Sequence, residues 1–126
     1  MDLEDYNAYC GSLTATTHVI QWGDAHVWKV GGKVFAIAGW NDGNSFAVTF
    51  KTSPDEFDFL IAIDGVRPAP YLASRGFTWV QHYRSPGLVD EDLREQIAES
   101  HRLVGLGLSK KKQRELGLRN DTTETH

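Results

Sequence analysis

The chain has 126 residues, of which 40% are hydrophobic and 24% charged, and its net charge at neutral pH is -4. This length suits one domain with a substantial core, and the acidic balance argues against a strong non-specific DNA-binding protein. The single cysteine excludes an intramolecular disulfide, no apolar run approaches the roughly 20 residues of a membrane span, and the acidic N-terminus is unlike a secretion signal. We therefore expect a cytoplasmic protein that does not enter membranes.

The first half of the chain predicts one helix followed by an antiparallel meander. Leu3, Tyr6 and Cys10 share one side of a helix over residues 2–12. Alternating and β-branched residues separated by short turns then predict successive strands over residues 17–22, 26–30, 33–40 and 45–51.

The clearest local signal in the sequence is the hairpin between the second and third of these strands. Gly31-Gly32 supplies the positive φ angles that a two-residue turn requires, and Lys29 and Lys33 stand on its two shoulders. The apolar residues Trp28 and Phe35 that flank the turn are candidates for the core. A hairpin tip with a lysine on each side is also a candidate nucleic-acid wing.

After the meander, Ser53 and Pro54 predict the start of a helix that ends near residue 63, with Glu56 completing a capping box. Residues 66–76 contain two prolines and are predicted to be mainly loop. The aromatic content of residues 77–83 predicts a fifth strand.

The C-terminal part of the chain predicts two further helices. Acidic residues at positions 90–92 favour the first turn of a long helix over residues 90–108. Ser109 then caps a short basic helix over residues 110–116. The polar residues 119–126 are predicted to form a disordered tail, so that the single domain comprises residues 1–118.

Charge is distributed unevenly along the chain. Residues 1–66 carry three basic and nine acidic residues, whereas residues 100–119 carry six basic residues and one acidic residue. Such asymmetry favours a surface for an anionic partner, although cations near a helix C-terminus also stabilise the helix itself. The candidate nucleic-acid contacts are Lys29, Lys33, Arg67, Arg75, Lys110, Lys111, Lys112 and Arg114.

The sequence offers little sign of catalysis. No pair of histidines, nor Cys10 with a histidine, has the spacing of a zinc site, and no nucleophile with a general base can be assigned, so we expect no enzyme activity, no metal centre and no cofactor. Asp2, Glu4 and Asp5 form an acidic cluster that suits a hard cation, but acids are also expected at a helix N-terminus. His101 lies on the predicted buried stripe, where a hydrogen-bonded core histidine is the favoured role.

Several segments together resemble one family. The hairpin sequence Val27-Trp28-Lys29-Val30-Gly31-Gly32-Lys33-Val34-Phe35-Ala36 is similar to a strand pair of the MmcQ/YjbR family of small bacterial proteins. Further similar segments extend the resemblance to about Leu118. These segments are Lys51 with Ser53-Pro54-Asp55-Glu56, Arg67-Pro68-Ala69-Pro70-Tyr71-Leu72, Trp79-Val80, Asp90-Glu91-Asp92-Leu93 and Leu108 to Leu116.

The resemblance implies an α+β fold similar to frataxin/CyaY, with an antiparallel sheet of about five strands and flanking helices. We expect the first helix and the long helix to pack on one face of that sheet. Members of the family are commonly labelled DNA-binding from structural analogy, so the resemblance implies a non-enzymatic binding module with DNA as a possible partner. Two alternatives stay open, namely a protein- or small-ligand-binding site in the loop around Tyr71, and frataxin-like cation binding near Asp2, Glu4 and Asp5. The expected oligomeric state is a monomer or a weak homodimer.

Overall fold

The computed structural model describes residues 1–41, 46–70, 72 and 78–118. Tyr71, Arg75 and the predicted tail over residues 119–126 lie outside the described residues. The elements in chain order are α1 (Leu3–Ser12), β1 (Thr16–Gln21), β2 (Ala25–Val30), β3 (Lys33–Ala38), β4 (Val48–Lys51), α2 (Pro54–Ile61), β5 (Val66–Pro68), β6 (Trp79–His82), α3 (Asp90–Leu106) and α4 (Lys110–Glu115). Among the described helices, none is both long and apolar enough to cross a bilayer.

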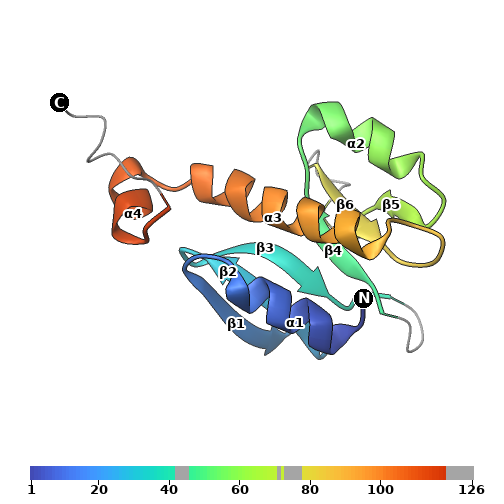
Figure 1. Cartoon of the computed structure of the whole chain (residues 1–126), viewed down its shortest axis with the longest axis horizontal. Coiled ribbons are helices and arrows are strands. Elements are labelled where there is room, and N and C mark those ends of the chain that lie inside the picture. The colour runs from blue at the N-terminus through green and yellow to red at the C-terminus, as the bar shows by residue number, and fades with distance from the viewer. Residues whose placement is uncertain (42–45, 71, 73–77, 119–126) are drawn as a thin grey trace.

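The fold is α+β, as predicted, and its antiparallel sheet has the strand order β1-β2-β3-β4-β6-β5. The helices α1 and α3 lie on the same face of the sheet, and α3 runs diagonally across the central strands (Figure 1). A single apolar cluster joins these helices and α2 to the sheet, and its fully or nearly fully buried members include Tyr6, Cys10, Phe50, Leu60, Val80, Leu93 and Ile97. The expected packing of the first and the long helix on one sheet face is therefore confirmed.

The sheet has six strands where the sequence predicted about five, because the predicted loop over residues 66–76 begins as a strand. Val66–Pro68 forms β5, which pairs antiparallel with β6 through Val66 opposite His82 and Arg67 opposite Gln81. A proline lacks the N–H that a central strand needs, but Pro68 stands at the end of an edge strand, where that donor is dispensable. The two prolines favoured a loop in the sequence-based prediction, although the first three residues of this segment form a short edge strand.

A β-bulge in the hairpin adapts the sheet to α3. Opposite β2, the register passes from Ala36 paired with Trp28 to Val34 paired with Lys29, so Phe35 is the extra residue on β3. As a result Phe35 and Ala36 both belong to the apolar cluster beneath the helices, and the Phe35 ring meets the His101 ring edge-on at a centroid distance of 5.1 Å.

The hydroxyl of Ser100 on α3 completes the backbone hydrogen bonding beside this bulge. The Ser100 hydroxyl donates to the Phe35 carbonyl at 2.7 Å and accepts from the Lys51 N–H at 2.8 Å. Ser100 is fully buried, so a small polar side chain on a helix satisfies backbone groups of two adjacent strands.

Candidate nucleic-acid interface

The β2–β3 hairpin tip packs against the junction between α3 and α4. Gly31 and Gly32 have φ angles of 59° and 83°, as the predicted two-residue turn requires. A Cβ added to Gly31 would lie 2.5 Å from Leu108 Cδ1 and 3.2 Å from Leu116 Cδ1, so only glycine permits this close approach. The hairpin tip and the C-terminal helix, which are far apart in the sequence, therefore form one part of the surface.

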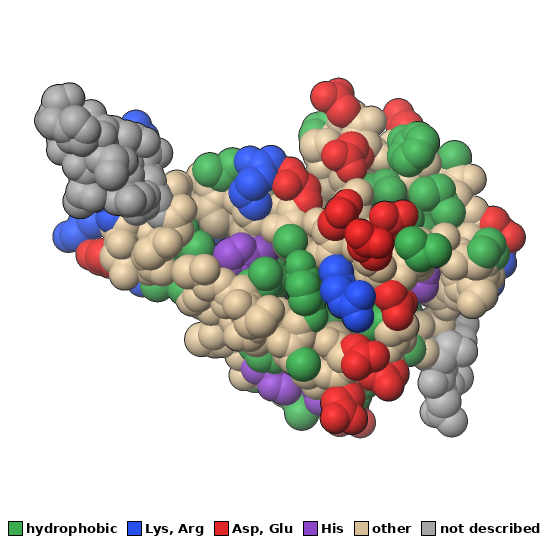
Figure 2. Space-filling model, viewed as in Figure 1, with side chains coloured by type: hydrophobic (Ala, Val, Ile, Leu, Met, Phe, Trp, Pro, Cys, Tyr) green, Lys and Arg blue, Asp and Glu red, His purple; other side chains and the backbone are tan. Residues whose placement is uncertain are grey.

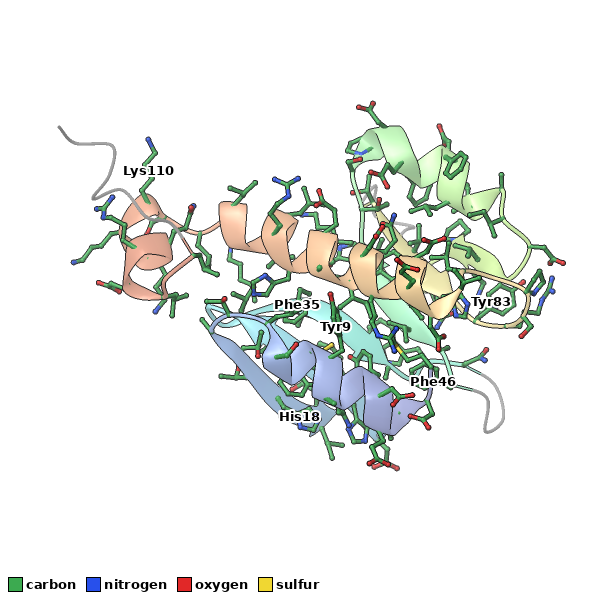
Figure 3. All side chains as sticks on the ribbon, viewed as in Figure 1. Tyr9, His18, Phe35, Phe46, Tyr83 and Lys110 are labelled. Carbon is green, nitrogen blue, oxygen red and sulfur yellow. The ribbon has the colours of Figure 1, made fainter. Side chains whose placement is uncertain are left out.

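The short helix α4 is held at the end of α3 by side-chain caps. The Ser109 hydroxyl accepts from the Lys112 N–H at 3.1 Å, which confirms the predicted cap. Gln113 is 6% exposed, and its Nε2 donates to the Leu108 carbonyl at 2.8 Å and to the Leu106 carbonyl at 3.4 Å. These bonds satisfy carbonyls at the C-terminus of α3 and leave the lysines of α4 exposed, with Lys110 directed away from the sheet (Figure 3).

Seven cationic residues consequently gather at one end of the molecule, which we call the basic end: Lys29, Lys33, Lys51, Lys110, Lys111, Lys112 and Arg114. Within the described part of the chain, no ion pair joins any of these six lysines to a carboxylate. All of these residues except Lys51 were predicted contacts, but the sequence did not show that the lysines of the hairpin and those of α4 meet.

Acidic side chains gather at the opposite end, over the N-terminal parts of α1 and α3 (Figure 2). We call this the acidic end and define it by Asp2, Glu4, Asp5, Asp24, Asp90, Glu91 and Asp92. The chain therefore carries two regions of opposite sign, which its net charge of -4 does not reveal.

A groove of about 390 Å³ lies within the basic end, where β3 and β6 begin and β4 ends beside α3. Lys33 and Lys51 line the groove together with Trp79, Leu72 and Leu103. Lys51 and Trp79 are direct cross-strand partners, so a cation and an aromatic ring stand next to each other on one face. Neither residue was predicted as a contact. The position of Lys51, at the end of a strand and just before the Ser53 helix cap, was a signal that could have indicated it.

The remaining predicted contacts are not joined to the basic end. Arg67 is half-buried against β6 and the segment after β3, where its Nε donates to Gln81 Oε1 at 2.8 Å and its guanidinium lies 4.2 Å from the centroid of the Tyr83 ring. A weaker bond runs from Arg67 to Asn41 Oδ1 at 3.4 Å. These contacts give Arg67 a structural role in closing the sheet face opposite the helices, while Arg75 and Tyr71 lie outside the described residues.

The residues considered for metal binding have local structural roles. Asp2 caps α1, because its Oδ1 accepts from the Asp5 N–H at 2.8 Å. His18 Nε2 and His26 Nδ1 are 3.0 Å apart and form a hydrogen-bonded pair, with the His18 ring stacked on Trp28 at a centroid distance of 4.7 Å. In the described ranges, no group of three or more histidine, cysteine or acidic side chains is arranged to hold a metal ion.

The fold lowers the pKa of two histidines, which predicts a loss of stability in acid. Burial lowers the pKa of His82, with a smaller contribution from the nearby Met1 ammonium that Asp90 partly offsets, and burial together with the charge of His26 lowers the pKa of His18. The unfolded chain therefore binds protons more readily than the folded protein once the pH falls through the ordinary histidine pKa of about 6.5. We expect the free energy of unfolding, measured with urea, to decrease between about pH 7 and pH 5.

The variant His82→Phe tests this origin of the acid sensitivity. His82 is tightly enclosed, since a Cβ added to Gly87 would lie 2.2 Å from its Nε2, and phenylalanine preserves a planar ring of similar size. The variant is expected to lose less stability on acidification than the parent. An equal loss in both proteins would assign the effect to other groups.

Comparisons with known proteins support one family and one fold. A family model described as YjbR matches residues 11–103. The crystal structure of Deinococcus radiodurans protein DR2400, with its DUF419 domain, is similar with a TM-score of 0.78 at 23% identity, covering 93% of this chain and 88% of that one. A Pseudomonas syringae protein of known structure is similar with a TM-score of 0.68 at 17% identity, covering 82% of this chain and 98% of that one. Among curated proteins the comparison found no match.

Proposed function

The chain belongs to the YjbR family, and from this premise we propose that it is a non-enzymatic binding module whose basic end contacts nucleic acid. The observation that carries the proposal is the docking of the hairpin tip on the α3–α4 junction, with Gly31 against Leu108 and Leu116. This contact unites two groups of lysines that the sequence separates. A cytoplasmic location belongs to the same proposal.

The chemistry of the basic end suits a phosphate backbone. Lys33 and the three lysines of α4 are exposed, and lysine ammonium groups bind phosphates as point charges without base specificity. The hairpin and α4 present these charges from two separate elements, which allows contacts with more than one phosphate. The acidic end lies at the other end of the molecule from such a partner, so the greater separation weakens its repulsion of the phosphates.

Binding to nucleic acid is expected to weaken steeply with salt. If four to six lysines neutralise phosphates, log Kd should change with log salt with a slope of magnitude roughly 4 to 5 on duplex DNA, and the affinity at low salt should be on the order of micromolar. The triple variant Lys110→Gln, Lys111→Gln, Lys112→Gln should reduce that slope by about 2 to 3. Fluorescence anisotropy of labelled duplex and single-stranded oligonucleotides at several salt concentrations measures both quantities.

The triple arginine variant at positions 110, 111 and 112 is the matched control, because it keeps the charge at the same exposed sites. It should bind like the parent. Binding that the glutamine variant leaves unchanged would exclude α4 from the interface. If neither duplex nor single strand binds the parent at low salt, the nucleic-acid proposal fails.

The groove beside α3 favours a second candidate function, the binding of a small anionic ligand. Lys33 and Lys51 supply positive charge, and Trp79 and Leu72 supply apolar surface for a flat group. Leu72 directly follows Tyr71, around which a ligand-binding loop was predicted. A titration with a nucleoside monophosphate distinguishes the two candidates. If the groove binds a small ligand, the mononucleotide should bind as tightly as a longer oligonucleotide. Its affinity should then fall in Lys51→Gln and stay unchanged in the triple glutamine variant of α4.

A further inference from the structure

The strand β1 is an unprotected edge of the sheet. Within the described part of the chain it pairs only with β2, and its sequence Thr-Thr-His-Val-Ile-Gln contains neither an acidic residue, a lysine, an arginine nor a proline. Large apolar side chains are exposed along it and just after it, with Val19 37%, Ile20 55% and Trp22 52% accessible. Both sides of this strand therefore present apolar surface next to a free row of backbone donors and acceptors.

The other edge of the same sheet shows how a protected edge differs. β5 has three residues, carries Arg67 and ends in Pro68. A short length, a charge and a proline are the devices by which proteins prevent strand addition at an edge. β1 has six residues and none of these devices, so it is suited to pairing with another strand.

We propose that β1 pairs antiparallel with β1 of a second copy of this chain, which makes a continuous sheet through a two-fold homodimer. A two-fold axis places like residues near one another across the junction, and a strand without charged residues tolerates this arrangement. Antiparallel addition supplies backbone hydrogen bonds to both strands, and the added strand covers part of the exposed surface of Val19 and Ile20 in each copy.

The charge distribution specifies the second copy as the partner. The N-terminal residue of β1, Thr16, lies opposite Val30 beside the hairpin tip at the basic end, and its C-terminal residue, Gln21, lies opposite Ala25 beside Asp24 at the acidic end. β1 therefore runs from the basic end to the acidic end. An antiparallel copy places its acidic end beside the basic end of the first, and this occurs twice in the dimer.

The self-association proposal rests on β1 and does not depend on the proposed nucleic-acid function. Its test is sedimentation velocity of the full chain over a series of concentrations from low to high micromolar, with the double variant Val19→Lys and Ile20→Lys. The lysines introduced in one copy would lie near those of the other copy across the two-fold axis, and their repulsion should prevent the two β1 strands from pairing. The parent should shift from monomer towards dimer with concentration, and the double variant should remain monomeric.

The matched control is Phe59→Lys with Ala62→Lys, which adds the same charge at exposed apolar residues of α2 and its C-cap, and this helix packs on β5 and β6 near the other edge of the sheet. This control should dimerise like the parent, and circular dichroism should show that all three proteins are folded. A parent that stays monomeric at every concentration overturns the proposal. A dimer that survives the β1 variant but dissociates in the control also overturns it, because the interface would then lie elsewhere.

Discussion

The variant Phe35→Asp is expected to unfold the domain. Phe35 is fully buried, and the bulge directs it into the cluster beneath α3, against the His101 ring. A carboxylate there loses the packing of a large aromatic ring, which is worth about 3–5 kcal/mol, and adds the several kcal/mol needed to bury an unpaired charge. The sum is comparable with the total stability of about 5–15 kcal/mol of a typical domain.

Thermal unfolding followed by circular dichroism measures this effect, with Phe59→Asp as the control. Phe59 is 72% exposed on α2, so the same substitution there should leave the melting temperature close to that of the parent. A Phe35→Asp protein that melts like the parent would contradict the placement of the bulge and of the hairpin against α3.

The variant Ser100→Ala is expected to have the second-largest effect on stability. Removing the hydroxyl leaves the Phe35 carbonyl and the Lys51 N–H without their partner in a fully buried position. Each unsatisfied buried group costs about 1–3 kcal/mol, so with two such groups the free energy of unfolding should fall by about 2–6 kcal/mol.

Urea denaturation measures this loss, and Ser12→Ala provides the comparison because the Ser12 hydroxyl is also bonded to a backbone carbonyl but is exposed. The Ser12 variant should change stability little. If Ser100→Ala and Ser12→Ala were equally stable, the bridge between β3 and β4 would carry no net stabilisation.

The sequence predicted most elements of the fold because their signals are local. Gly31-Gly32 specifies its turn through backbone conformation alone, and Ser53 and Ser109 specify helix starts through bonds to residues three positions later. Glu56 was predicted to complete a capping box with Ser53. Its carboxylate instead accepts from Gln96 Nε2 of α3 at 3.2 Å, a contact between two helices that no capping pattern encodes.

The features that the sequence left unseen depend on contacts between distant segments. The bulge at Phe35 is specified partly by Ser100, 65 residues later, and β5 forms because β6 offers it a partner. The same holds for the site. The lysines of the hairpin and of α4 were predicted separately, whereas the groove residues Lys51 and Trp79 meet only through strand pairing. Arg67 was selected for its charge, but its bonds to Gln81 and Asn41 hold it in the sheet.

The separation of charge along the molecule gives a single copy of the chain an electric dipole, with its positive pole at α4 and its negative pole at the N-termini of α1 and α3 (Figure 2). A polyanion exerts a torque on such a dipole and turns the positive pole towards itself before contact, so an acidic monomer is captured in one orientation. Because the Debye length is about 8 Å at physiological ionic strength and about 30 Å at 0.01 M, this alignment acts over the length of the molecule only in dilute salt. Association rates should consequently depend on ionic strength even where the number of phosphate contacts does not change.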